Sequence, residues 1–91
     1  MIVKISNYGK LDDKNFIEYE VNGLSASQMS FLDKNLEDET EINGDSLKIK
    51  MYFEDMLYPF QSDVAKFRLD DFIAREEIEM NLFLSSFLED M

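Results

Sequence analysis

The sequence contains no cysteine and no histidine among its 91 residues. The missing cysteine excludes disulfides and thiolate metal sites, and the missing histidine removes the side chain that most often acts as a general base near neutral pH. No Walker, Gly-x-Gly-x-x-Gly or nucleophile-elbow motif is present, and a chain this short offers little room for a substrate cleft of about 300 Å³ or more. We therefore expect a protein that is not an enzyme and that binds no cofactor.

Long hydrophobic runs and secretion signals are also missing. No apolar run approaches the roughly 18–20 residues of a membrane span, and the first ten residues lack a basic stretch followed by a hydrophobic one. No part of the sequence has the composition of a linker between domains. We expect one domain over residues 1–91 in a soluble, cytoplasmic protein that does not contact a membrane.

Positive charge is scarce, because nine Lys and Arg stand against twenty Asp and Glu, a formal net charge of -11. Phosphate binding needs Lys and Arg, so this balance argues against direct contact with DNA, RNA or anionic lipid and favours a basic protein partner. The chain nevertheless has 45% hydrophobic residues, including eight Phe and four Tyr, which is too apolar for a disordered acidic tail. We therefore expect a folded acidic domain.

Five short patterns place an apolar residue beside or between charges at a spacing of two, which is typical of a strand with one face in a core and one in water. They are Lys4-Ile5, Glu18-Tyr19-Glu20, Lys48-Ile49-Lys50, Lys66-Phe67-Arg68 and Glu77-Ile78-Glu79. Extending them predicts the following inward side chains: Met1, Val3, Ile5, Ile17, Tyr19, Val21, Leu47, Ile49, Met51, Phe53, Ala65, Phe67, Leu69, Ile78, Met80, Leu82 and Leu84. Two strands present bases outward and two present acids, so we expect opposite charges to face each other across an antiparallel sheet.

The clearest helix signal lies between the second and third predicted strands. Ser25 and Gln28 form a Ser-x-x-Gln capping box, and Leu24 and Met29 fit the hydrophobic staple. These features predict a helix over residues 26–36, with an apolar stripe that can lie on one face of the sheet.

A tight-turn pair, Asn43-Gly44, follows this helix. It predicts a hairpin between a short strand at 40–42 and a longer one at 46–53. The segment 54–63 contains the only proline and shows no clear period, so we expect a partly buried connection there.

The C-terminal region allows two interpretations. We favour the fifth strand, through residues 77–84, followed by a short amphipathic helix to the C-terminus. The alternative is one long helix from Asp70 onward. On a helical wheel, however, Ile78 and Leu82 fall opposite the main apolar stripe and Glu76 falls inside it, so the strand leaves fewer residues misplaced.

Together these elements predict an α+β fold, a mainly antiparallel sheet of about five strands with the helix at 26–36 and a short C-terminal helix packed on it. The charges on the predicted strand faces, five bases and four acids, nearly cancel. The other residues hold sixteen acids and four bases, a net charge of -12. The surplus acid therefore lies outside the predicted sheet.

The surplus is densest between Asp33 and Asp45, where six acids accompany a single base, Lys34. The candidate partner-binding residues are Asp33, Glu37, Asp38, Glu39, Glu41 and Asp45, together with Glu54 and Asp55. A row of carboxylates about 5–7 Å apart resembles the phosphates of a nucleic acid, so it can occupy a groove built for them. The stretch lacks the spacing of a calcium-binding loop, so we expect no metal site there.

These features predict a small acidic inhibitor that, like phage anti-defence proteins, blocks the basic surface of a nucleic-acid-binding enzyme or complex, as a monomer or a homodimer. One alternative is an immunity protein or antitoxin that inserts aromatic anchors into a toxin, with Phe16, Tyr52, Phe83 and Tyr8 as outward-facing candidates. Another alternative is a structural subunit whose charge only keeps it soluble.

Overall fold

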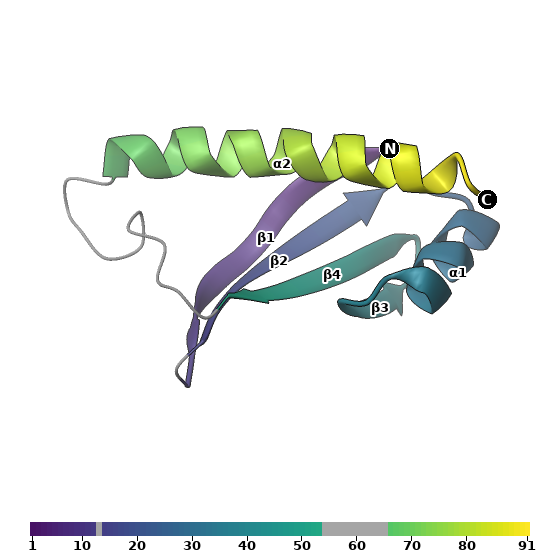
Figure 1. Cartoon of the computed structure of the whole chain (residues 1–91), viewed down its shortest axis with the longest axis horizontal. Helices are drawn as coiled ribbons and strands as arrows, with labels where there is room; N and C mark the ends of the chain where they lie inside the picture. The colour runs from purple at the N-terminus through teal and green to yellow at the C-terminus, as the bar shows by residue number, and fades with distance from the viewer. Residues whose placement is uncertain (13, 54–65) are drawn as a thin grey trace.

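In the part of the chain that the structure describes, the elements are two antiparallel hairpins and two helices (Figure 1). The computed structural model describes residues 1–12, 14–53 and 66–91, and for residues 10, 11, 53 and 66–70 it describes the backbone but not the side chain. In these residues the elements are β1 (Ile2–Leu11), β2 (Lys14–Asn22), α1 (Ala26–Asn35), β3 (Glu39–Asn43), β4 (Ser46–Phe53) and α2 (Lys66–Leu88). The strands form an antiparallel sheet in the order β1-β2-β4-β3, which confirms the predicted α+β class.

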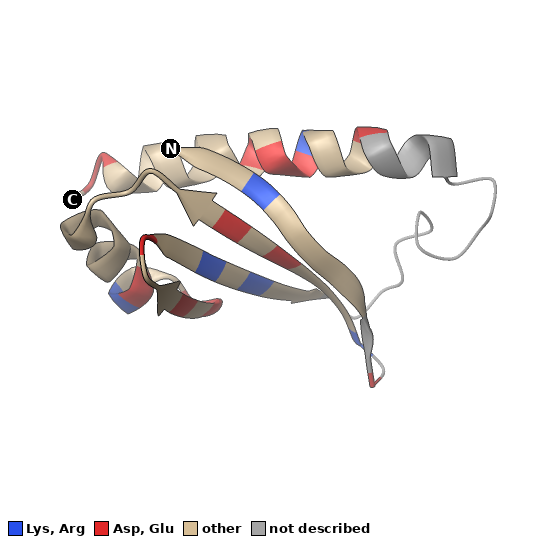
Figure 2. Cartoon of the chain, turned by 180° about the vertical axis from the view of Figure 1, so that it is seen from behind, with Lys and Arg blue, Asp and Glu red and all other residues tan. Residues whose placement is uncertain are grey.

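The inner face of the sheet follows the predicted period of two. The inward residues of β2 lie directly opposite those of β4 in the pairs Ile17 with Met51, Tyr19 with Ile49, and Val21 with Leu47. In β1, Val3 and Ile5 continue these rows, whereas Met1 is exposed and the side chain of Phe53 is outside the described residues. The alternate residues turn to the opposite, outer face, where several are charged (Figure 2). Because apolar and polar residues alternate along these strands, most of their apolar side chains face the core.

The helix α1 begins as its capping box predicts. Ser25 Oγ accepts the backbone N–H of Gln28 at 3.1 Å, and Gln28 Oε1 accepts the backbone N–H of Ser25 at 2.9 Å. Met29 and Leu32 are buried against the sheet, while Asn35 ends the helix one residue earlier than predicted. Two reciprocal hydrogen bonds therefore satisfy donors that a helix start would otherwise leave open.

The hairpin at Asn43-Gly44 is also confirmed. The strand β3 pairs with β4 up to Asn43 and Ser46, which flank the turn. Gly44 has a φ of 64°, in the left-handed region that glycine adopts without a steric penalty. The connection predicted at 54–63 lies outside the described residues.

The two strands predicted after residue 64 are wrong. Residues 66–69 and 78–84 both lie in α2, so the described sheet has four strands and the expected short C-terminal helix is the last part of a 23-residue one. Ala65, placed inward in one of those strands, is outside the described residues. The alternative of one long helix was correct, although the helix begins four residues before Asp70.

Three residues explain why the strand pattern was misleading. Ile78 and Leu82 do not need burial, because they are 62% and 66% exposed on the helix surface. Glu76 fits inside the apolar stripe because its Oε2 accepts a hydrogen bond from Tyr19 OH at 3.4 Å. The short alternation around Ile78 is therefore a coincidence of charge spacing on a helix.

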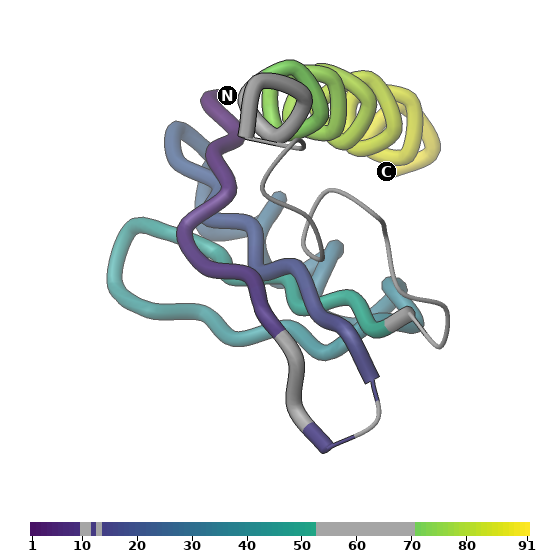
Figure 3. Tube along the Cα trace, turned by 90° about the vertical axis from the view of Figure 1, so that its left-hand side faces the viewer, coloured from purple at the N-terminus to yellow at the C-terminus, as the bar shows by residue number. Residues whose placement is uncertain are grey.

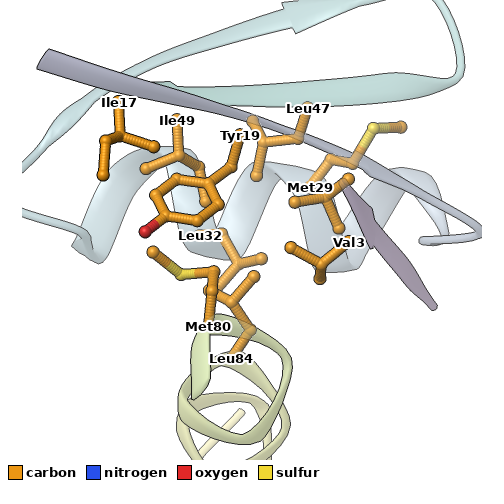
Figure 4. Close-up of a cluster of buried hydrophobic side chains, with 10 residues drawn as sticks. Val3, Ile17, Tyr19, Met29, Leu32, Leu47, Ile49, Met80 and Leu84 are labelled. Carbon is orange, nitrogen blue, oxygen red and sulfur yellow. The ribbon is translucent and has the colours of Figure 1, made fainter. Parts of the chain in front are cut away.

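Both helices pack on the same, inner face of the sheet. Figure 3 shows α2 nearly end-on above the strands, next to the start of β1. Met80 and Leu84 of α2 meet Met29 and Leu32 of α1 over the inward strand residues (Figure 4). Figure 4 labels this core as Val3, Ile17, Tyr19, Met29, Leu32, Leu47, Ile49, Met80 and Leu84. The helices thus leave the outer face of the sheet for other contacts.

Candidate partner-binding surface

The outer face of the sheet carries its charges in two rows that run across the strands (Figure 2). One row contains Lys4, Glu20, Lys48 and Glu41, and the next contains Glu18, Lys50 and Glu39. Acids and bases alternate along both rows. The predicted pairing of opposite charges is therefore confirmed for residues 18–20 and 48–50, whereas residues 66–68 and 77–79 lie in α2.

The two lysines of β4 make their closest described contacts with residues of β2. Lys48 Nζ lies 3.9 Å from Glu18 Oε1, and Lys50 Nζ lies 4.7 Å from the centroid of the Phe16 ring, a cation–π contact. Within the described part of the chain, neither glutamate of β3 has a Lys or Arg nitrogen within 4.0 Å. Two exposed carboxylates at the edge of the sheet are thus left without a salt bridge.

Six of the candidate residues gather on the side of the sheet formed by β3. They are Asp33 in α1, Glu37 and Asp38 between α1 and β3, Glu39 and Glu41 in β3, and Asp45 in the β3–β4 turn. We call this set the acidic edge. All of its members except Asp38 are exposed. The other two candidates, Glu54 and Asp55, lie outside the described residues.

Hydrogen bonds orient two members of the acidic edge. Thr40 Oγ1 donates to Asp33 Oδ1 at 2.5 Å, which ties the last turns of α1 to β3. Tyr52 OH donates to Glu39 Oε2 at 3.2 Å, across the pairing of β4 with β3. Each of these two carboxylates is therefore oriented by a hydroxyl group of the sheet.

The aromatic candidates divide between the two faces. Phe16 and Tyr52 lie opposite each other on the outer face, as predicted. A bulge in β1 places Tyr8 opposite the inward residue Ile17, so the expected outward position of Tyr8 is wrong. Phe83 is 48% exposed, but it lies on α2 and not on a strand.

Carboxylates also meet between the sheet and α2, around the phenol of Tyr19. Burial raises the pKa of Tyr19, and the charges of Glu76, Glu79 and Asp38 raise it further. Burial and the neighbouring Glu79 raise the pKa of Glu76, and burial and Glu37 raise that of Asp38. Sequence reasoning missed the role of Glu76, although its position inside an apolar helical stripe was a usable signal.

The opposite edge of the sheet, β1, is covered by side chains of α2. Glu77 Oε2 accepts the backbone N–H of Ile5 at 2.7 Å, and Asn81 Nδ2 donates to the carbonyl of Met1 at 3.5 Å. Lys4 Nζ lies 4.0 Å from Glu77 Oε1. These contacts occupy backbone groups that an added strand would use, so the edge is protected at the start of β1.

A groove of about 440 Å³ runs between β1 and α2. Its apolar wall includes Ile2, Ile78 and Leu82, which are 58%, 62% and 66% exposed. Apolar surface of this kind, when contiguous, is typical of protein interaction sites. The sequence prediction missed the groove because it placed Ile78 and Leu82 inside the core.

Metal-binding clusters and membrane-spanning helices are both absent from the described residues. They contain no group of three or more Asp or Glu side chains placed to hold a metal ion. None of the helices described in residues 1–12, 14–53 and 66–91 is long and apolar enough to span a membrane.

Over residues 2–90 the chain matches the model of a family of unknown function (DUF5750). The chain belongs to this family. No curated protein matches the sequence. The family description names no activity, so the functional inference for this DUF5750 member depends on the surfaces described above.

Proposed function

We propose that this protein uses the acidic edge to bind and block a basic, nucleic-acid-binding surface of a protein partner, without catalysing a reaction. One observation carries the proposal. Glu39 and Glu41 are exposed and lack a salt bridge within the described residues, while the lysines of the next strand contact Glu18 and Phe16 of β2. Carboxylates that are not neutralised within the protein remain available to a basic partner.

The spacing of these carboxylates supports mimicry of a phosphate backbone. Glu39 and Glu41 are two residues apart on a strand, so they point to the same face about 7 Å apart. The other members of the acidic edge extend the negative surface beyond both ends of β3. Lys and Arg groups that are arranged for nucleic acid would meet this row as they meet phosphates, and the affinity should therefore fall steeply with salt.

A second candidate, a toxin-neutralising immunity protein or antitoxin, is supported by a different surface. The groove between β1 and α2 exposes Ile78 and Leu82, and α2 also exposes Phe83, outside the groove, in contact with Phe87. Buried apolar anchors usually dominate the affinity of such complexes. For this candidate, substituting Ile78 and Leu82 by Ser should raise the off-rate of the toxin, whereas charge changes should mainly slow association.

Two triple variants with equal changes in net charge test the first proposal. The six substituted residues are all exposed, and they are Glu37, Glu39 and Glu41 in the test variant and Asp71, Glu89 and Asp90 in the control variant, each changed to Lys. Each protein is immobilised, exposed to a lysate of its native host and eluted with a salt gradient. We expect wild type and control to retain a nucleic-acid-binding protein that the test variant binds at least about tenfold more weakly.

The retained protein is then assayed for nucleic-acid binding with and without this chain. Inhibition that is lost in the test variant alone supports the proposal. Equal retention by both triple variants would contradict it, because the effect would then depend on net charge and not on the acidic edge. A salt-resistant complex that is lost on substituting Ile78 and Leu82 would instead favour the immunity protein. A large, stable homo-oligomer in light scattering would favour a structural subunit.

A further inference from the structure

The strand β3 leaves backbone groups open along the edge of the sheet. In antiparallel pairing, hydrogen-bonded pairs alternate with non-hydrogen-bonded ones, and the pair that flanks a two-residue turn is hydrogen-bonded. Here that pair is Asn43 with Ser46. The N–H and C=O groups of Thr40 and Ile42 therefore point away from β4, toward the open side of the sheet.

The hydrogen bond at the far edge of the sheet gives an independent check on this alternation. When the alternation is carried through the register from β3 to β4, β2 and β1, it leaves the N–H of Ile5 pointing out of the sheet. This N–H does donate outward, to Glu77 Oε2 at 2.7 Å. The same phase therefore holds at both edges, and within the described residues no hydrogen bond occupies the outward groups of Thr40 and Ile42.

The geometry points to an extended, basic segment of the partner that adds to the sheet as a new strand beside β3. This inference rests on the proposed function, since it specifies how the acidic edge is engaged. Main-chain hydrogen bonds to Thr40 and Ile42 would fix the register of the added strand, as in other complexes formed by strand addition. The open backbone groups and the carboxylates without a salt bridge thus belong to one docking site.

The side chains of β3 indicate the composition of the added strand. Glu39 and Glu41 lie on the outer face, so Lys or Arg at alternate positions of the added strand would lie beside them. Ile42 lies on the other face and is 44% exposed, which suits an apolar or β-branched neighbour. The occupant is therefore an extended segment in which basic and apolar residues alternate.

A second copy of the chain is a poorer occupant of this edge. Pairing of two β3 strands would bring Glu39 and Glu41 of one copy beside the same residues of the other, and each copy carries a net charge of -11. Like charges directly opposite each other on neighbouring strands are destabilising. Charge complementarity therefore favours a basic partner over self-association.

The first test uses a short peptide of alternating lysine and valine as the probe. The control is a peptide of the same sequence with its backbone amides N-methylated, which keeps the charge but removes the main-chain donors. We expect the N-methylated peptide to bind about tenfold more weakly, because it loses the hydrogen bonds to β3. Equal affinity of the two peptides would overturn strand addition.

Hydrogen exchange followed by NMR identifies the bonds directly. In the free protein the amides of Thr40 and Ile42 should exchange rapidly, and the peptide should slow their exchange at least about tenfold. The amide of Glu41, which points to β4, should change little and serves as an internal reference. Bound peptide with no protection of Thr40 and Ile42 would contradict the inference while leaving purely electrostatic binding possible.

Two protein variants separate this inference from the proposed function. Ile42→Pro removes one outward donor without removing a bond to β4, so it should weaken binding of the unmodified peptide more than binding of the N-methylated one. Replacing Glu39 and Glu41 by Gln should lower the affinity for both peptides, because it removes the negative charge of β3. If the Gln variant binds both peptides as wild type does, the acidic edge itself is refuted. If only Ile42→Pro has no effect, strand addition alone is refuted.

Discussion

The two edges of the sheet are built in opposite ways. Side chains of α2 cover β1, where Glu77 and Asn81 hydrogen-bond the outward backbone groups of Ile5 and Met1. The strand β3 has no such cover within the described residues, and its outer face carries the exposed carboxylates of Glu39 and Glu41. The unpaired backbone groups of an edge strand can pair with a strand of another chain. Proteins usually prevent this by covering the edge or by placing charged side chains on it. Within the described residues, this protein covers the start of one edge with α2 and lines the other edge with carboxylates.

Weakening the packing of α2 on the sheet should have the largest effect on stability. It would also uncover β1, so that the two edges would become alike. Leu84 is fully buried in the core, so Leu84→Ala should lower the free energy of unfolding by about 2–5 kcal/mol. Leu82→Ala, on the same helix but 66% exposed, is the matched control and should change it by less than about 0.5 kcal/mol. Urea denaturation measures both. Similar losses for the two variants would mean that α2 does not pack as described.

Removing the cover at a single point should have a smaller effect. Glu77→Ala removes the acceptor for the Ile5 amide and should cost about 1–3 kcal/mol in the free energy of unfolding. Asp71→Ala, at an exposed position of the same helix, should stay within about 0.5 kcal/mol. Hydrogen exchange at the Ile5 amide should accelerate in the Glu77 variant alone. Unchanged protection of this amide would contradict the capping of β1 by Glu77.

The partly buried carboxyl groups of Glu76 and Asp38 should make the stability of the fold depend on pH. The pKa values of Glu76 and Asp38 are raised in the folded state, mainly by burial, so folding binds protons that the unfolded chain has released. The free energy of unfolding should therefore rise as pH is lowered from neutral through the raised pKa values. This stabilisation is lost when pH is raised above them. In Glu76→Gln the slope over this window should be smaller, as measured by urea denaturation across pH. An equal slope in wild type and variant would exclude Glu76 as a source.

The open edge should contribute least to stability. Glu41 is exposed and has no salt bridge within the described residues, so Glu41→Gln should change the free energy of unfolding by less than about 0.5 kcal/mol. The same substitution should lower the affinity for the lysine–valine peptide. Together, the two results are those expected of a residue that binds a partner and has little structural role. Thermal unfolding and peptide titration measure the two effects. A stability loss as large as that of Glu77→Ala would mean that the two edges are not different in kind.

Local patterns predicted much of the fold because the residues that determine it are close in sequence. The capping box of Ser25 and Gln28 predicted the start of α1, and Asn43-Gly44 predicted the second hairpin. The alternation around Tyr19 predicted both the strand and its buried face. Around Ile78, alternation over only three residues was equally compatible with a helix, so the length of α2 was not recognised.

The candidate site was predicted in composition but not in arrangement. The sequence already contained the acidic stretch from Asp33 to Asp45. It could not indicate that Lys48 would lean toward Glu18 and leave Glu41 unpaired, because that choice depends on which strands become neighbours. The cap that Glu77 forms on β1 joins residues 72 positions apart and was equally inaccessible.

The acidity of the protein, the inward and outward faces of three strands, and the start of α1 can all be read from composition or from spacing within a few residues. Which edge of the sheet is covered and which is open depends instead on how distant segments pack. This outcome depends on α2 lying beside β1, where buried residues such as Leu84 hold Glu77 in reach of Ile5. Contacts between distant segments come from packing of the whole chain, which no local pattern contains.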